Sequence, residues 1–144
     1  MAAASIYGST VMLTRAVDRT APWREALEAV GARVVEVPCI ATAPADPGPL
    51  QAALAMPTKW AALTSPNGVR AVAAALQGAA PPWRRLAVVG PGTAAAAAAN
   101  GWAVDLQPAQ ADGTSLAAAL VPYLDLEGSV LLPRGDLAGD DLPA

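Results

Sequence analysis

The hydrophobic positions of the chain fall into short apolar runs that alternate with stretches of helical spacing. The apolar runs, which are typical of buried strands, occupy positions 11–13, 34–37, 60–63, 86–89, 102–106 and 129–132. Between the first two runs, apolar residues recur at i, i+3, i+4 and i+7: Trp23, Ala26, Leu27 and Val30. This spacing predicts one apolar helix face. We expect Thr20 as the N-cap, Pro22 in the first turn and Gly31 just after the last turn.

The same reasoning predicts further helices at positions 50–55, 69–76, 94–99 and 116–121. The helix at 94–99 consists of alanine alone, which costs no side-chain entropy and lets a helix lie close to a sheet. Segment 41–49 is rich in proline and cannot form a regular element, so we expect it to cross into a second body of structure. Strands alternating with helices imply right-handed crossovers and a parallel sheet covered on both faces. The predicted fold is therefore α/β, with flavodoxin-like, doubly wound parallel sheets.

Composition acts mainly by exclusion. The chain has 144 residues, one cysteine (Cys39) and no histidine, which excludes a disulfide framework, imidazole catalysis and a multi-thiolate metal site. Nine basic and twelve acidic residues give a net charge of −3 without a basic cluster, so we expect no nucleic-acid partner. There is no basic leader and no apolar stretch long enough to span a bilayer. We therefore expect a cytoplasmic protein that does not contact a membrane.

In open α/β sheets, ligands bind beyond the carboxyl ends of the strands. Those ends carry polar or glycine-rich segments at positions 14–15, 64–68, 90–93, 112–115 and 134–136. We expect Ser65 to cap a helix with Pro66 at its first position, which leaves N–H groups at the positive end of the helix dipole. Gly90 and Gly92 let backbone approach a ligand closely, and Thr93 adds a hydroxyl. These loops together predict a site for carboxylate or phosphate.

Each of these residues also has a purely structural interpretation. Ser65 can serve only as an N-cap, Asn67 and Thr93 can satisfy local backbone groups, and Arg134 can pair with Asp136 or Asp140. Several other polar and aromatic residues lie outside the predicted edge. Arg84 and Arg85 precede their strand and are most simply a solvated pair, Cys39 is expected to pack, and Trp23, Trp60 and Trp83 suit core or lid contacts.

A dinucleotide site is a competing interpretation of the second loop. Residues 90–95 satisfy the G-x-G-x-x-A fingerprint, and Asp105 follows Gly90 by fifteen residues. The fingerprint normally opens its domain at the first strand, whereas this loop follows several earlier elements. A non-catalytic module that binds an anion or a small molecule is the other alternative, and binding of NAD(P) separates the two.

The order of the motifs is more informative than any one of them. In chain order they are Leu13-Thr14-Arg15, residues 31–38, Leu63-Thr64-Ser65-Pro66-Asn67-Gly68, Val88-Val89-Gly90-Pro91-Gly92-Thr93, residues 113–116 and Leu131-Leu132-Pro133-Arg134-Gly135-Asp136. From position 11 to the end, this order and spacing resemble uroporphyrinogen-III synthase. The resemblance implies a bilobal α/β protein with its active site in the cleft between the lobes.

Members of that family cyclise the linear tetrapyrrole hydroxymethylbilane, inverting ring D through a proposed spiro-pyrrolenine intermediate and losing water. The resemblance thus implies a hydro-lyase of porphyrin biosynthesis, on the route to haem, sirohaem and cobalamin, without a metal or organic cofactor. It places Thr93 as the candidate catalytic residue. The candidate substrate-binding residues are Arg15, Ser65, Asn67, Gly68, Gly90, Gly92, Thr114 and Arg134.

Family members usually continue for about a hundred residues beyond the position that corresponds to Ala144. The resemblance therefore implies that residues 1–38 are the first β-α-β of an incomplete lobe, 39–49 a crossing linker, and 50–144 a second lobe without its last strand. A β-α-β unit alone has little partner surface with which to bury its faces. We expect this truncated chain to be inactive, or nearly so, by itself; the sequence does not indicate its oligomeric state.

Overall fold

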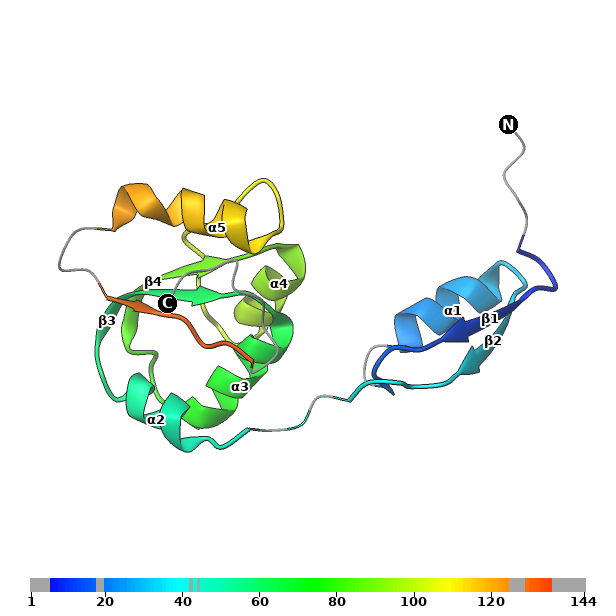
Figure 1. The fold of residues 1–144 in the computed structure, drawn as a ribbon, viewed down its shortest axis with the longest axis horizontal. Coiled ribbons are helices and arrows are strands. Elements are labelled where there is room, and N and C mark those ends of the chain that lie inside the picture. The colour runs from blue at the N-terminus through cyan, green and yellow to red at the C-terminus, as the bar shows by residue number, and fades with distance from the viewer. Residues whose placement is uncertain (1–5, 18–19, 42, 44, 125–128, 136–144) are drawn as a thin grey trace. The chain divides into compact units, whose positions relative to one another are not determined.

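The computed structural model describes residues 6–17, 20–41, 43, 45–124 and 129–135. The chain divides into two compact units, residues 1–45 and 46–144, which we call unit 1 and unit 2 and describe separately (Figure 1). In both units the described strands pair in parallel and are joined by helices. The predicted α/β class with parallel sheets is confirmed.

Unit 1 is one β-α-β unit. Strands β1 (Thr10–Leu13) and β2 (Arg33–Glu36) pair in parallel, and helix α1 (Ala21–Ala29) connects them. Gly31 follows the helix with φ +80°, as expected for the residue that ends it. A side chain at this position would also meet the ring of Tyr7, because an added Cβ would lie 2.2 Å from Tyr7 Cδ2.

Helix α1 covers one face of the β1–β2 pair. Arg24 donates from Nε to Oε1 of Glu36 at 3.0 Å and forms a salt bridge with it, so Glu36 lies on the covered face. Side chains alternate across a strand, which places Met12 and its register partner Val35 on the opposite face. Met12 is 61% exposed. Unit 1 therefore has one covered and one open sheet face among its described residues.

The predicted apolar face of α1 is largely uncovered. Trp23 is 54% exposed and Val30 is 53% exposed, while Leu27 is half-buried. Thr20 stands at the N-cap position but makes no capping bond, because its hydroxyl donates to the carbonyl of Val17 at 2.9 Å. The same hydroxyl also interacts with Glu36. The Thr20 hydroxyl first, and Arg24 second, hold the pKa of Glu36 below its ordinary value.

Unit 2 is built on a parallel sheet whose described strands run in the order β4-β3-β5. The strands are β3 (Thr58–Leu63), β4 (Trp83–Val88) and β5 (Val130–Leu131). The register pairs Leu63 with Val88 and Ala61 with Leu131. The helices are α2 (Gly48–Leu54), α3 (Pro66–Leu76), α4 (Pro91–Ala99) and α5 (Gly113–Leu120), which continues into the 3-10 turn η2 (Val121–Tyr123).

Both faces of this sheet are covered. Figure 1 shows α5 on one face and α2 and α3 on the other. The α3 side packs Leu63 and Leu86 against Val69 and Val72, with Ala97 of α4 in the same cluster. The α5 side packs Trp60, Ala62 and Ala87 of the sheet against Leu116 and Leu120 of the helix. Complete burial of a leucine or valine side chain contributes about 1.5–3 kcal/mol, so this double-sided core is the main stabilising feature of unit 2.

Several element boundaries differ from the prediction by a few residues. Helix α2 begins at Gly48, inside the segment expected to be irregular, because Asp46 Oδ1 accepts the Gly48 N–H at 2.9 Å and proline is tolerated in a first turn. Strand β4 already includes Arg84 and Arg85, which were expected to precede it. Helix α4 begins at Pro91, three residues before the alanine run, so Thr93 lies in its first turn.

The predicted strand at 102–106 is wrong. Only Leu106 bridges to β4, opposite Ala87. The carboxylate of Asp105 accepts the Leu86 N–H at 2.8 Å, while the Asp105 N–H donates to the Leu86 carbonyl at 2.8 Å. A side chain thus occupies a donor that a neighbouring strand would have used, and a continuous ladder does not form.

Candidate functional site

The loops that follow β3 and β4 lie side by side at the carboxyl edge of the sheet in unit 2. The last residues of the two strands, Leu63 and Val88, are register partners, so the chain leaves the sheet at the same level in both. The starts of α3 and α4 also approach each other. A Cβ atom added to Gly92 would lie 4.0 Å from Cγ of Pro66. The two loops that the sequence singled out therefore form one continuous surface.

Ser65 has the capping role that its position predicts. It is extended (φ −156°, ψ 154°), and its Oγ accepts the Gly68 N–H at 3.0 Å, which is a standard N-cap bond. Two of the predicted binding groups therefore bond to each other. Asn67 Oδ1 accepts a hydrogen bond from Arg70 one turn later. The half-buried Asn67 side chain is thus anchored on its own helix, and Arg70 places a positive charge beside the loop.

The loop after β4 is more deeply set than the loop after β3. Gly90 and Thr93 are both buried, and Thr93 is only 3% exposed. Gly90 caps α4 in extended conformation, and its carbonyl accepts the N–H groups of Thr93 at 3.1 Å and Ala94 at 3.0 Å. Gly92 is exposed in the first turn, where the helix provides no acceptor for its N–H. A ligand can therefore reach Gly92 more easily than Thr93.

A third loop reaches the same edge from the other face of the sheet. A Cβ atom added to Gly90 would lie 2.8 Å from Cβ of Ala111, a distance that real side chains do not allow. Ala111 directly precedes Asp112, whose Oδ1 accepts the Ser115 N–H at 2.7 Å and caps α5. Thr114 lies exposed in the first turn of α5. Gly90 is therefore the point where the second and third loops pack together.

Arg134 follows β5 and lies at the same edge of the sheet in unit 2. β5 pairs with β3 through Ala61 and Leu131, so the chain beyond Leu131 leaves the sheet beside the end of β3. Arg134 is half-buried. The alternative pairing of Arg134 with Asp136 or Asp140 lies outside the described residues.

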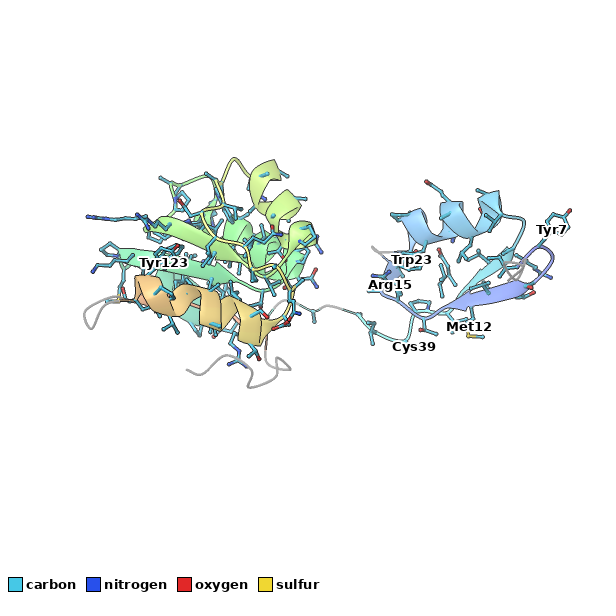
Figure 2. The ribbon with its side chains drawn as sticks, turned by 90° about the horizontal axis from the view of Figure 1, so that it is seen from above. Tyr7, Met12, Arg15, Trp23, Cys39 and Tyr123 are labelled. Carbon is cyan, nitrogen blue, oxygen red and sulfur yellow. The ribbon has the colours of Figure 1, made fainter. Side chains whose placement is uncertain are left out.

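Arg15 belongs to unit 1, whereas the edge described above belongs to unit 2. It follows β1 and lies with its guanidinium carbon 5.2 Å from the centroid of the Trp23 ring. Figure 2 shows both side chains at the same end of unit 1, remote from Tyr7. Trp23 is therefore an exposed residue and not part of a core. The contact was not predicted, since it depends on how α1 is oriented over its strands.

The structure also places four other residues that the sequence singled out: Cys39, Trp60, Arg85 and Asp105. Cys39 is exposed and not packed as expected; its Sγ lies 3.3 Å from the carbonyl of Val37. Trp60 is core, and Arg85 lies over its ring at 5.6 Å. The carboxylate of Asp105 is bonded to the backbone of β4, an arrangement that leaves it poorly suited to bind the ribose of a dinucleotide.

Neither a metal cluster nor a membrane-spanning helix is found in the described part of the chain. Its residues contain no group of three or more His, Cys, Asp or Glu side chains suited to hold a metal ion. No helix within the described ranges combines the length and the apolar character needed to cross a bilayer.

The comparison with protein families decides the identity of the chain. The family model for uroporphyrinogen-III synthase HemD matches residues 21–144. The chain belongs to the uroporphyrinogen-III synthase family. A curated member, the uroporphyrinogen-III synthase of Synechococcus elongatus, is 34% identical over 123 residues, which are 81% of this chain and 47% of that protein.

Solved structures of the synthase from the extremely thermophilic bacterium Thermus thermophilus have the same fold. A mutant form superposes with a TM-score of 0.55 at 17% identity, over 81% of this chain and 48% of that one. The wild-type form gives 0.51 at 17% identity, over 92% and 54%. The chain therefore spans about half the length of the synthases it matches, and the likeness to these structures concerns the fold alone.

Proposed function

We propose that this chain is part of a uroporphyrinogen-III synthase that closes hydroxymethylbilane to uroporphyrinogen III, with inversion of ring D and loss of one water molecule, in the cytoplasm. The observation that carries the proposal is the family match over residues 21–144. The edge formed by the loops after β3, β4 and β5 in unit 2 is physically suited to the substrate. Hydroxymethylbilane carries many acetate and propionate carboxylates, and the first turns of α3, α4 and α5 all begin at this edge.

We assign the binding of these carboxylates to helix starts and a few cations. The Gly92 N–H, the Thr114 hydroxyl and Arg134 are suited to this role, and the dipole of each helix favours a negative charge at its start. Ser65 and Gly68 are proposed binding residues too, and the hydrogen bond between them holds the start of α3 in place. Asn67 and Gly90 shape the surface of this edge and are proposed binding residues as well. Arg15, which belongs to unit 1, is proposed to bind a carboxylate of the substrate.

Thr93 is the proposed catalytic residue. Its hydroxyl lies at the start of α4 on a side chain that is 3% exposed, so a hydrogen bond to the substrate there is shielded from water and correspondingly stronger. In this role Thr93 donates to the departing hydroxyl or to a ring carboxylate. Catalysis then depends mainly on holding the chain in a conformation suited to ring inversion. No metal or organic cofactor takes part.

The test separates activity from binding. We expect that the purified 144-residue chain does not convert hydroxymethylbilane to the type III isomer. A fusion of this chain with the C-terminal half of the Synechococcus elongatus synthase should form that isomer. The isomers are separated by chromatography after oxidation to porphyrins. Type III product from the chain alone would contradict its expected inactivity, and its absence from a folded fusion would contradict the proposed activity.

Binding is measured by titrating the 144-residue chain with uroporphyrin III, a stable octacarboxylate. We expect Thr93→Ala and Ser65→Ala each to weaken binding by roughly three- to tenfold, the effect of about one hydrogen bond. Gln77→Ala, at the opposite end of α3, is the control and should bind like the wild type. Unchanged affinity in both loop variants would remove this edge from the proposal. Tight binding of NAD(P) would instead favour the dinucleotide alternative.

A further inference from the structure

Arg15 and Trp23 form an unusual pair at the end of unit 1 where β1 stops and α1 begins (Figure 2). The guanidinium carbon lies over the indole at 5.2 Å from its centroid, within the range of a cation–π interaction. Arg15 is half-buried. Trp23 is 54% exposed although it is the largest apolar side chain of α1. A side chain that is so exposed contributes little to a core, so packing does not explain why a tryptophan stands at this position.

The charge of Arg15 is not neutralised by any carboxylate in the part of the chain that the structure describes. The salt bridge recorded there joins Arg24 and Glu36 on the covered face of the unit. A ring and a carboxylate hold a guanidinium in different ways. A carboxylate occupies the N–H groups at the edge of the fork, whereas a ring packs on its face and leaves those donors available. Within the described part of the chain, Trp23 therefore holds Arg15 and leaves its charge and N–H donors available.

We propose that Trp23 is a positioning residue, which orients the Arg15 guanidinium to receive one carboxylate of the tetrapyrrole. The inference rests on the function proposed above, which supplies a carboxylate-rich ligand, and it adds a residue that the motifs did not indicate. A long arginine side chain loses much rotamer freedom when it binds. A ring that restricts the side chain beforehand reduces that loss, and ligand affinity rises accordingly.

A double-mutant cycle on the 144-residue chain tests the proposal, with uroporphyrin III as the probe. Arg15→Ala should weaken binding about tenfold or more, as expected for a hydrogen bond to a charged group. Trp23→Leu keeps an apolar side chain but removes the ring, and should weaken binding roughly two- to fivefold. In the Arg15→Ala background, Trp23→Leu should have no further effect, because the residue acts through Arg15. Val30→Ala, an exposed apolar change at the other end of α1, is the matched control.

Trp23→Phe keeps an aromatic face and should restore binding to within about twofold of the wild type. It also serves if Trp23→Leu loosens unit 1, which circular dichroism would detect. Three results would overturn the inference: wild-type affinity in Trp23→Leu, an equal loss with and without Arg15, or binding by Trp23→Phe as weak as by Trp23→Leu. If Ser65→Ala and Thr93→Ala still weaken binding, only this inference fails. If the wild type binds no uroporphyrin III, this inference and the proposed binding edge fail together, and the fusion assay decides the proposed activity separately.

Discussion

The two units use the same parallel β-α-β connection but differ in how much of it they bury. In unit 2 the sheet is covered by α2, α3 and α4 on one face and by α5 on the other. Among the described residues, the largest fully buried side chains all lie there: Leu63, Leu86, Leu116, Val69, Val72 and Val88. In the described part of unit 1 the buried apolar residues are Leu13, Ala16 and Ala32, of which two are alanines. The difference shows that strand pairing and a connecting helix do not by themselves create a core.

Unit 1 leaves several apolar side chains exposed, whereas a sheet in a doubly wound protein is covered on both sides. They include Met12 on the open sheet face, Trp23 and Val30 along α1, and Val37 after β2. The matched synthases are about twice as long as this chain. Unit 2 thus has a core on both sheet faces, whereas unit 1 leaves one sheet face open among its described residues.

The largest expected effect contrasts a core position with an open one. Leu86→Ala in unit 2 should lower the free energy of unfolding by about 2–5 kcal/mol, because it removes a fully buried side chain and leaves a cavity. Met12→Ala in unit 1 should change it by less than about 0.5 kcal/mol, since Met12 is 61% exposed. Urea denaturation followed by circular dichroism measures both. Similar losses in the two variants would abolish the distinction between the units.

A medium effect tests whether the close packing of unit 2 extends to its ligand edge. Gly90→Ala should cost about 1–3 kcal/mol, because the new methyl group overlaps with Cβ of Ala111. Gly90 has φ −174°, so the cost is a matter of space and not of backbone strain. Ala111→Gly in the same chain should recover most of the loss. A Gly90→Ala variant as stable as the wild type would mean that the two loops are free to separate.

The smallest effect concerns the polar contacts that hold α1 on β2 in unit 1. The pKa of Glu36 is lowered by Thr20 and then by Arg24, so its stabilising contribution is present above the ordinary glutamate pKa and is lost as the pH falls through the lowered value. Glu36→Gln should reduce stability at neutral pH and have no effect at a pH below the lowered pKa. Thermal unfolding over that range provides the measurement. Because Arg24, the partner of Glu36 in the salt bridge, is 46% exposed and solvent screens the pair, the difference should be small. A loss that persists in acid would assign it to packing instead.

Most of the elements could be predicted from sequence because their signals are local. Ser65 and Pro66 mark the start of α3, and Gly31 marks the end of α1, by rules that involve only neighbouring residues. The alternation of strand and helix then determines that the loops after β3 and β4 share an edge. Asp105 was not predictable in the same way, because its carboxylate bonds to Leu86, nineteen residues away in the sequence.

The details of the candidate site depend on contacts between elements. Such contacts cannot be predicted from neighbouring residues in the sequence. Gly90 looked like a residue that lets a ligand approach, but its nearest obstacle is Ala111 of the third loop. Trp23 has the spacing of a core residue, but it is 54% exposed and its ring lies against Arg15. The roles of Thr93, Thr114 and Arg134 remain predictions, since binding depends on a ligand.

The bond between Asp105 and Leu86 has a consequence for the behaviour of the protein in solution. β4 is an edge strand among the described strands, and an edge strand offers unpaired N–H and C=O groups to any other chain. Here the Leu86 N–H is taken by a carboxylate, the Leu86 carbonyl by backbone N–H groups of residues 105 and 106, and the Val88 N–H by the Leu106 carbonyl. The carboxylate of Asp105 also places a charge on this edge, which disfavours pairing with another strand. Residues 105 and 106 thereby protect this edge of the sheet against edge-to-edge aggregation, and Asp105→Ala would expose the Leu86 N–H.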